Sequence, residues 1–364
     1  MSLKVGIVGL PNVGKSTLFN ALTNSNVEVA NYPFATISPN KATVPVPDSR
    51  LDLLDRLFHS QKKINATIEF VDIAGLIAGA SKGEGLGNAF LSNIRETDAI
   101  VHVVRGFNDK EILHVTNKID PVAAIETINL ELILADEEVI RKRLERIKAK
   151  KNGVPLEIKK ETALLNKLAQ QLQQGQLLNQ LDFDEAESKL LKNFQLLTAK
   201  PFIYVLNVAE SDLHNHSQFA QKIKDYLQSQ GAPLIQISAA FEVQLSDVSE
   251  AEKKQFLTEY GIESSGLEQL ICEAYRQLGL QTFFTAGKQE SRAWAFRAGM
   301  MAPQGGGLIH SDIERGFIKV DVYNFEDVKE LGSEKLVKER GRLRLEGKNY
   351  RLKDGDICYF RFHV

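Results

Sequence analysis

The sequence Gly-Leu-Pro-Asn-Val-Gly-Lys-Ser at residues 9–16 constrains the fold of this chain more than any other feature. It matches the pattern G-x-x-x-x-G-K-[ST], and it lies between an apolar, strand-like run at residues 3–9 and a helical pattern at residues 17–22. The glycines allow backbone N–H groups to converge on phosphate oxygens, and the N-terminus of the following helix adds its dipole. A strand, this loop and a helix in that order predict an α/β fold that holds a nucleotide.

The side chains of this loop have distinct expected roles. The ammonium group of Lys15 should reach the β and γ phosphates of the nucleotide, and the hydroxyl of Ser16 should bind Mg²⁺. The other residues expected around the phosphates are Asn12, Val13, Gly14 and Thr17. The loop therefore predicts a nucleoside triphosphate with Mg²⁺ as the ligand.

A second phosphate-sensing element follows another predicted strand. Asp72-Ile73-Ala74-Gly75 comes directly after the apolar run at residues 67–71 and fits the pattern DxxG. Asp72 would hold a water on the metal, while the amide of Gly75 would sense the γ-phosphate. The segment between the two motifs should supply a threonine to Mg²⁺, for which Thr36 is the better candidate and Thr43 the weaker. Together these elements predict a switch-type NTPase, in which γ-phosphate contacts order two loops and hydrolysis releases them.

Two segments compete for contact with the base. Residues 117–120 spell Asn-Lys-Ile-Asp, the guanine signature NKxD. Only about a dozen residues separate them from the strand that ends near Arg105, too few for a crossover and a new strand. Residues 207–210, Asn-Val-Ala-Glu, follow the apolar strand at 201–206 instead, and residues 237–240 follow at the distance expected of the last base loop. We therefore expect the base to meet Asn207, Val208, Glu210, Ser238 and Ala239.

The residues of this second segment bear on the choice of base. In NKxD the Asp accepts hydrogen bonds from guanine N1 and N2, and the stem of the Lys packs along the ring. Here Glu210 is one methylene longer than that Asp, and Val208 replaces the Lys. Because hydrogen-bond matching supplies large selectivity ratios, a site without the paired acceptor loses most of its discrimination for guanine. ATP is therefore the expected substrate, in preference to GTP.

Apolar runs along the chain predict the sheet of the nucleotide-binding domain. Helical patterns lie between most of these runs, which implies right-handed βαβ crossovers and a mostly parallel sheet. The runs are residues 3–9, 67–71, 99–104, 202–206 and 234–237.

The regular alternation of strands and helices breaks twice. Residues 123–200 are rich in Leu, Glu, Lys and Gln with apolar residues at helical spacing, which predicts two long antiparallel helices inserted into the α/β domain. Whether this pair is only structural or is a partner-binding arm stays open. Beyond residue 282, strand candidates alternate with turns and predict a compact α+β module. The expected domains are a P-loop nucleotide-binding domain at 1–122 and 201–281, an inserted helical coiled coil at 123–200 and the module at 282–364.

Composition excludes several classes of protein. The 45 Lys and Arg residues nearly balance the 47 Asp and Glu residues, which excludes a nucleic-acid binder driven by global charge but leaves room for a local basic patch. No run approaches the ~20 apolar residues of a membrane span, and the N-terminus lacks the parts of a signal peptide. Cys272 and Cys358 lie far apart and outside any Cys/His cluster, so neither a disulfide nor zinc is expected. We expect a cytoplasmic protein without a membrane or DNA partner.

Longer stretches of the sequence resemble one known family. They are GLPNVGKST at 9–17, NYPFATISPN at 31–40, EFVDIAGLIAGASKGEGLGNAF at 69–90, NVAE at 207–210, RAWAFRAGMMAPQGGGLIHSDIERGFIKV at 292–320 and LKDGDICYFRFHV at 352–364. They resemble the YchF subfamily, the Obg-like ATPases among the Obg-related P-loop NTPases, and the resemblance covers nearly the whole chain. One departure is Ala295 after Trp294, where we would expect a Thr, and it lies outside the nucleotide site.

The resemblance implies a fold, an activity and partners. The fold would be a G domain with an inserted helical arm and a C-terminal TGS domain of the ubiquitin-like, β-grasp type. The activity would be slow hydrolysis of ATP, which family members bind in preference to GTP. The partners would be ATP and the ribosome, with the large subunit and its rRNA as the expected binding surface.

The group that positions the attacking water is not obvious from the motifs. A Gln commonly follows the DxxG glycine in switch GTPases, but Leu76 stands there and cannot orient water. His114, in a polar loop, is the candidate for this role, against a plain surface histidine. His102 lies within a predicted strand and is expected to be a core residue. Asn12 resembles the Asn that helps to bind K⁺ beside the phosphates in several related NTPases, although it could merely shape the loop. The expected catalytic residues are Lys15, Gly75 and His114.

One short segment of the C-terminal module is basic. It contains Lys335, Lys338, Arg340, Arg342, Arg344, Lys348, Arg351 and Lys353. This segment is either a solvated face or a surface that meets ribosomal RNA through its phosphates. Two functions follow from the sequence: an ATPase switch whose hydrolysis times its release from a ribosome, and a nucleotide-gated RNA- or ribosome-binding module in which hydrolysis is incidental.

Overall fold

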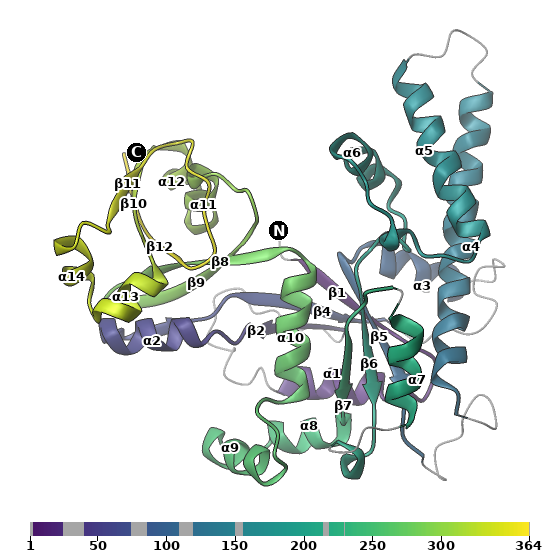
Figure 1. Cartoon of the computed structure of the whole chain (residues 1–364), viewed down its shortest axis with the longest axis horizontal. Helices are drawn as coiled ribbons and strands as arrows, with labels where there is room; N and C mark the ends of the chain where they lie inside the picture. Colours follow the sequence, from purple (N-terminus) through teal and green to yellow (C-terminus); the bar gives the residue numbers. More distant parts are fainter. Residues whose placement is uncertain are drawn as a thin grey trace. The chain divides into compact units, whose positions relative to one another are not determined.

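The computed structural model describes residues 3–24, 40–73, 86–108, 119–149, 156–213, 218–228 and 230–363. Contacts divide the chain into two compact units, one formed by Met1–Thr43 with Glu69–Leu270 and the other by Val44–Ile68 with Ile271–Val364. Figure 1 labels their helices and strands. In the part of the chain that the structure describes, no helix is long and apolar enough to cross a membrane.

The described residues of the first unit form a six-stranded sheet in the order β2-β4-β1-β5-β6-β7. Its strands are β1 (Lys4–Val8), β2 (Lys41–Pro45), β4 (Thr67–Asp72), β5 (Ala99–Arg105), β6 (Phe202–Asn207) and β7 (Leu234–Ile237). The pairs β4 with β1, β1 with β5, β5 with β6 and β6 with β7 are all parallel. The predicted parallel sheet is therefore confirmed at these strands, and their carboxyl ends meet at one edge.

Helices pack against this sheet through apolar side chains. Ile125, Ile128 and Leu132 join one buried cluster with Ile100 of β5 and Tyr204 of β6, and α1 packs beside α8. The helices and single turns are α1 (Lys15–Asn24), α3 (Leu86–Arg95), α4 (Pro121–Lys148), α5 (Leu156–Gln173), η3 (Leu178–Gln180), α6 (Glu185–Phe194), η4 (Glu210–Asp212), α7 (Gln218–Leu227), α8 (Ala239–Ser246), α9 (Glu250–Glu259) and α10 (Gly266–Gln277). The P-loop thus connects the buried strand β1 to helix α1, as its motif requires.

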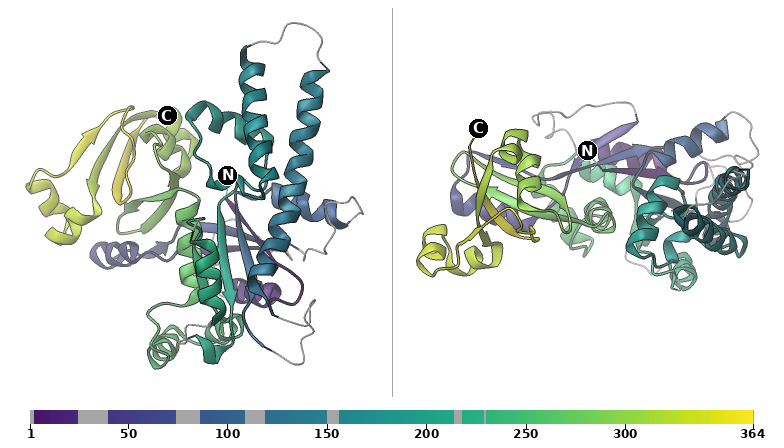
Figure 2. Two further views of the ribbon diagram at one scale, coloured as in Figure 1. Left: turned by 45° about the vertical axis from the view of Figure 1, so that its right-hand side comes forward. Right: turned by 90° about the horizontal axis from the view of Figure 1, so that it is seen from above.

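The predicted pair of long inserted helices is present as α4 and α5, which lie side by side in every view of Figures 1 and 2. Apolar side chains at helical spacing, among them Ile140 of α4 and Leu165 of α5, are buried. Residues 150–155, which connect the two helices, lie outside the described residues. The amphipathic pattern of both helices is thus used to bury a shared apolar stripe.

A buried carboxylate anchors the first of these helices. Asp136 of α4 is fully buried and accepts hydrogen bonds from the backbone N–H of Leu197 (3.0 Å), the backbone N–H of Thr198 (2.8 Å) and the hydroxyl of Thr198 (2.7 Å). Burial raises the pKa of Asp136, although these hydrogen bonds oppose the shift. The contacts fix the base of the helical pair to the chain that enters β6.

The second unit contains a mixed sheet, in the order β11-β10-β12-β8-β9-β3 among its described residues. Its strands are β3 (Lys62–Ile64), β8 (Leu280–Ala286), β9 (Glu290–Arg297), β10 (Phe317–Asn324), β11 (Arg344–Glu346) and β12 (Asp356–Phe362). β8 with β9, and β10 with β11 and β12, are antiparallel, whereas β12 with β8, and β3 with β9, are parallel. Its helices are α2 (Ser49–Phe58), α11 (Ala302–Ile309), α12 (Ser311–Arg315), α13 (Phe325–Leu331) and α14 (Glu334–Glu339). This is the α+β architecture predicted for the C-terminal module.

The segment Val44–Ile68 belongs to this second unit, whereas the sequence prediction assigned it to the nucleotide-binding domain. The strand β3 extends the C-terminal sheet by pairing with β9, and the hydroxyls of Ser60 and Ser291 lie 2.7 Å apart. Arg50 of α2 pairs with Asp354 at 2.6 Å. The prediction followed continuity along the chain, which cannot detect pairing between segments that are far apart in sequence.

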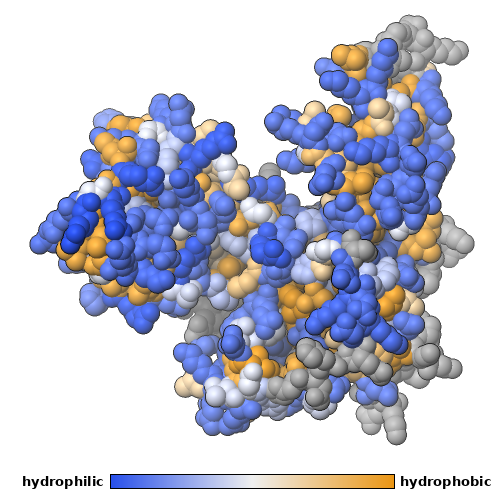
Figure 3. Space-filling view, viewed as in Figure 1, coloured by the Kyte–Doolittle hydropathy of each residue, from blue (hydrophilic) through white to orange (hydrophobic). Residues whose placement is uncertain are grey.

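The surface that Figure 3 presents is mostly hydrophilic, with scattered apolar residues. Large exposed apolar side chains include Leu130 and Leu134 of α4 and Tyr359 of β12. Leu130 and Leu134 lie one turn apart on the same face of α4, whereas Tyr359 lies on the other unit. Small exposed apolar areas of this kind are common on folded proteins.

Candidate nucleotide-binding site

The carboxyl ends of the parallel strands surround a pocket of about 610 Å³ in the first unit. The pocket lies where open α/β sheets bind their ligands. Its lining comes from the P-loop and α1, from the loops after β5 and β6, and from the start of α8. The lining residues are Asn12, Gly14, Lys15, Ser16, Thr17, Phe107, Asn108, Asn207, Val208, Ala209, Glu210, Ser238, Ala239 and Ala240. The structure thus brings the predicted phosphate-binding and base-binding residues together, with Val13 buried behind the pocket at 3% exposure.

The backbone of the P-loop is held in an unusual conformation. Gly14 has a φ of 92°, and a Cβ atom there would lie 2.1 Å from Nδ2 of Asn207. Asn12 has a φ of 62°, in the left-handed region that Asn tolerates better than most residues. A side chain at Gly14 would therefore displace either the loop or Asn207.

Lys15 keeps its ammonium group inside the loop. The residue is only 8% exposed, and Nζ donates hydrogen bonds to the carbonyl oxygens of Gly9 (2.9 Å) and Leu10 (2.7 Å). Burial lowers the pKa of Lys15 to about 8, although the negative charge of Asp72 opposes the shift. An anion placed in this pocket would favour the charged form of the lysine, as a phosphate group does.

Asp72 ends β4 close enough to Lys15 for their charges to interact. Burial raises the pKa of Asp72, and the positive charge of Lys15 opposes that shift. Oδ1 of Asp72 is buried and has no hydrogen-bond partner within the described ranges. A buried carboxylate oxygen without a partner costs free energy, so this atom is suited to accept a hydrogen bond from a ligand or a metal-bound water.

Asn207 ties the phosphate loop to the base loops. It is 6% exposed, its Nδ2 donates to the carbonyl of Val13 at 2.9 Å, and its Oδ1 accepts from the N–H of Ala239 at 2.9 Å. The backbone N–H of Val208 donates to the carbonyl of Ile237 at 2.8 Å. These bonds hold three loops in one arrangement, so a ligand that spans phosphate and base regions would meet a preformed site.

Glu210 follows at the start of η4, on the rim of the same pocket. Its Oε1 accepts a hydrogen bond from the hydroxyl of Tyr260, the residue that ends α9. The Tyr260 ring packs against Phe241 of α8, with ring centroids 4.7 Å apart. Sequence reasoning missed Tyr260, because nothing local marks a residue 50 positions further along the chain.

Two further pocket residues, Phe107 and Asn108, were also missed. They lie two and three residues after the end of β5, and the guanidinium of Arg105 lies 4.5 Å from the centre of the Phe107 ring. Nε of Arg105 donates to the carbonyl of Phe107 at 3.1 Å, which fixes the turn after the strand. The sequence signal that could have found Phe107 was an aromatic residue just beyond a buried parallel strand, at the edge of the sheet where ligands bind.

Several predicted residues lie outside the described residues, namely Thr36, Gly75, Leu76 and His114. Asp120, the last residue of the NKxD-like segment, is described: its carboxylate caps α4 by accepting from the N–H of Ala123 at 3.2 Å. His102 is a buried core residue, as predicted, and burial lowers its pKa to about 3, so that it stays neutral. Its role is therefore packing beneath the site, where it cannot add positive charge.

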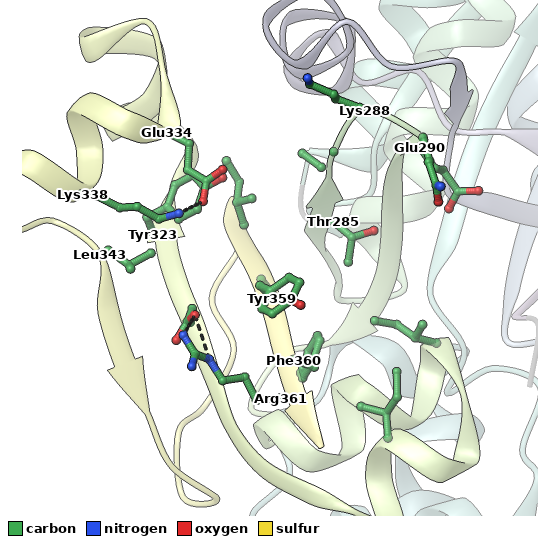
Figure 4. A pocket seen from close by; sticks show the side chains of 18 residues that line it. Thr285, Lys288, Glu290, Tyr323, Glu334, Lys338, Leu343, Tyr359, Phe360 and Arg361 are labelled. Atoms are coloured by element: carbon green, nitrogen blue, oxygen red, sulfur yellow. Dashed lines mark hydrogen bonds and ion pairs between the residues drawn. The ribbon is translucent and has the colours of Figure 1, made fainter. Parts of the chain in front are cut away.

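A second pocket, of about 680 Å³, lies within the C-terminal unit and is drawn in Figure 4. Four of the charged residues that line it form ion pairs: Lys338 pairs with Glu334 at 2.5 Å, and Arg361 pairs with Asp321 at 2.6 Å. No motif points to this pocket, in contrast to the one at the P-loop.

A phosphate loop between β1 and α1, at the carboxyl edge of a parallel sheet and tied to a base loop by Asn207, defines a P-loop nucleoside triphosphatase with a G-domain fold. A family model described as a 50S ribosome-binding GTPase matches residues 4–136, and the model of the YchF GTPase C-terminal domain, described as a protein of unknown function, matches residues 280–363. The chain belongs to the YchF family.

Similar proteins extend over the whole chain. It is 49% identical to the "Ribosome-binding ATPase YchF" of Bacillus subtilis and 45% identical to that of Escherichia coli O157:H7, each over 100% of both chains. A solved structure, "Structure of the Schizosaccharomyces pombe YchF GTPase", has a TM-score of 0.91 and 39% identity, and the match covers 99% of this chain and 98% of that one. The names of these relatives differ in the nucleotide, ATPase in the first two and GTPase in the third, so the choice of base has to be argued from the site.

Proposed function

We propose that this chain binds ATP with Mg²⁺, hydrolyses it slowly to ADP and phosphate, and uses the cycle to control its association with ribosomes. The observation that carries the proposal is the pair of hydrogen bonds made by the Asn207 side chain, which hold the P-loop and the base loop in one pocket. The curated relatives, named as ribosome-binding ATPases, support both the activity and the partner. A ribosomal partner supports a cytoplasmic location, and the proposal includes no membrane or DNA partner.

The residues at the phosphate end fit a magnesium nucleotide. Ser16 and Thr36 would supply hydroxyl ligands, and Asp72 would hold a metal-bound water through its buried Oδ1, which has no partner among the described residues. When bound, Mg²⁺ would neutralise charge on the β and γ phosphates. Lys15 would add a second positive charge at these phosphates by turning from the carbonyls of Gly9 and Leu10.

The base end favours adenine over guanine. Val208 stands where guanine-binding sites carry a Lys, and Glu210 replaces the Asp, so the paired acceptor for guanine is absent. Phe107 adds an aromatic face to the pocket, on which a purine of either kind can stack. Ser238 and Ala239 would approach the base from the loop after β7.

Catalysis rests on positioning and charge, because the loop after β4 lacks a Gln. Gly75 would contact the γ-phosphate, and His114 would orient the attacking water in place of the missing side chain. Asn12 would help to hold a K⁺ ion whose charge substitutes for an arginine finger. Hydrolysis rates measured in K⁺ and in Na⁺ test this last role, and equal rates would reject it.

The basic segment of the C-terminal unit is the proposed contact with the large subunit and its rRNA. Part of its charge is used internally, since Arg342 pairs with Asp327 and Glu330, and Lys335 pairs with Glu339. The residues that remain exposed for phosphate contacts include Arg340, Lys348, Arg351 and Lys353. The full-length chain with these four residues changed to Gln should pellet less with ribosomes, most clearly at low salt.

The test of the function compares nucleotides and ribosomes directly. Dissociation constants for ATP and GTP, measured side by side, should favour ATP, and equal or reversed affinities would contradict the proposed base. Single-turnover hydrolysis should be faster with ribosomes present. Leu76 in place of the Gln favours a second candidate, a nucleotide-gated ribosome-binding module with incidental turnover, and an unstimulated rate would support it.

A further inference from the structure

The contact between Tyr260 and Glu210 joins two parts of the first unit that the motifs do not connect. Tyr260 ends α9, and its ring is held against Phe241 of α8, so the hydroxyl is directed by packing rather than by its own loop alone. The hydroxyl donates to Oε1 of Glu210. The neighbouring carboxylate also raises the pKa of Tyr260, which keeps the phenol protonated and able to donate at neutral pH.

The hydrogen bond changes what the carboxylate can offer to a base. A guanine presents two donors side by side, N1–H and the N2 amino group, and a carboxylate recognises them best with both oxygens. An adenine presents a single donor, the N6 amino group, beside the acceptor N1. The hydroxyl of Tyr260 uses one of the two lone pairs of Oε1, so Oε2 is the oxygen of this carboxylate that the Tyr260 contact leaves unoccupied.

We propose that Tyr260 is a specificity-determining residue: its hydroxyl occupies Oε1 of Glu210 and orients the carboxylate so that Oε2 faces the base, which suits the single donor of adenine and weakens paired recognition of guanine. The inference rests on the proposed function, because it assumes that Glu210 faces the base. Tyr260 itself acts through Glu210 and is a positioning residue. Glu210, which replaces the Asp of NKxD, and Tyr260 would then select the base together.

The central variant is Tyr260→Phe in the full-length chain, because the ring and its packing on Phe241 stay and only the hydroxyl is lost. The readout is the ratio of the dissociation constants for GTP and ATP. Since one hydrogen bond to a charged acceptor is worth roughly a factor of ten in affinity, the ratio should move about tenfold toward GTP. ITP, which lacks the 2-amino group, should gain less than GTP, because it has only the N1–H donor for the freed carboxylate.

Two controls separate this role from a structural one. Tyr359→Phe removes an exposed hydroxyl from the C-terminal unit and should leave the ratio unchanged. In a Glu210→Ala background, Tyr260→Phe should no longer move the ratio, because its effect passes through the carboxylate. A change of the same size in that background would show that Tyr260 acts independently of Glu210, and would overturn the inference.

The outcome for Tyr260 can be read apart from the outcome for the proposed function. The wild-type preference tests whether the site selects ATP at all. The shift between wild type and Tyr260→Phe tests the inference, whichever nucleotide the wild type prefers. An unchanged ratio, or an equal loss of affinity for ATP, GTP and ITP, would mean that the hydroxyl only stabilises the fold, and the inference would fail.

Discussion

Replacing Lys15 by Met should stabilise the folded chain while abolishing its affinity for ATP. The buried ammonium group is disfavoured in the folded state, as its pKa of about 8 against an ordinary 10.5 shows. At ~1.36 kcal/mol per pKa unit, this difference corresponds to roughly 3 kcal/mol of penalty on the charged form. The variant should recover about 1–3 kcal/mol in the free energy of unfolding, because loss of Lys15 also leaves Asp72 without its opposing charge.

The pH dependence of the stability difference tests whether the buried charge of Lys15 is its cause. The folded pKa of Lys15 lies below the unfolded value, so the penalty is fully present below about pH 8 and disappears as the pH rises through 10.5. The stability of the wild type should therefore rise toward that of Lys15→Met over this range. The quantity to follow is the difference in free energy of unfolding between wild type and Lys15→Met at each pH, because groups that titrate in both proteins cancel from it.

The assay is urea unfolding followed by circular dichroism at pH 7 and at pH 10, without nucleotide. Lys254→Met is the matched control, because Lys254 is exposed on α9 and should change stability little at either pH. Binding of ATP at pH 7 is measured in parallel. A Lys15→Met protein that is less stable than the wild type at pH 7, or whose advantage does not shrink at pH 10, would refute the reasoning, and unchanged ATP affinity would refute the P-loop assignment.

Three further variants test the roles proposed for residues at the nucleotide. Asn207→Ala removes two buried hydrogen bonds and leaves the carbonyl of Val13 and the N–H of Ala239 unpaired. It should cost about 2–4 kcal/mol of stability and weaken the binding of ATP and GTP alike. A stability within about 0.5 kcal/mol of wild type, the size of a neutral surface change, would show that Asn207 does not hold the loops together. Val208→Lys with Glu210→Asp restores the guanine signature and should shift preference toward GTP; unchanged relative affinities would place base selection elsewhere. His114→Ala should slow single-turnover hydrolysis and leave ATP affinity intact; a wild-type rate would exclude His114 from catalysis.

The sequence predicted the parts of the site that depend on local order. The P-loop, the strand before it and the DxxG strand are each read from about ten contiguous residues, because β-strand, tight loop and helix N-terminus follow one another directly. Asn207 was found because it also follows a buried strand. The pocket brings together the P-loop and the residues after β6 and β7, while the roles of the individual residues stay predictions.

The parts that escaped prediction depend on contacts distant in sequence. Tyr260 reaches Glu210 only after α8 and α9 have packed together, and β3 joins the C-terminal sheet only by pairing with β9. Phe107 differs, because its position was readable from the sequence, but the polar residues after it suggested a plain loop. A motif predicts the local loop and its own side chains, but it says little about which side chains from distant parts of the sequence contact that loop.

Because Val44–Ile68 belongs to the C-terminal unit, this segment cannot finish folding during synthesis until the end of the chain has been made. The backbone of Ser60 is made long before Ser291, its partner 231 residues further on. At ~5–20 residues per second, α2 and β3 would wait on the order of tens of seconds for the strand that β3 joins. During that interval the apolar face of α2 has no sheet to cover, and the edge of β3 is unpaired. A stop codon placed before β8 would make this condition permanent, so shortened forms of the protein should aggregate or be degraded rather than persist as an isolated nucleotide-binding domain.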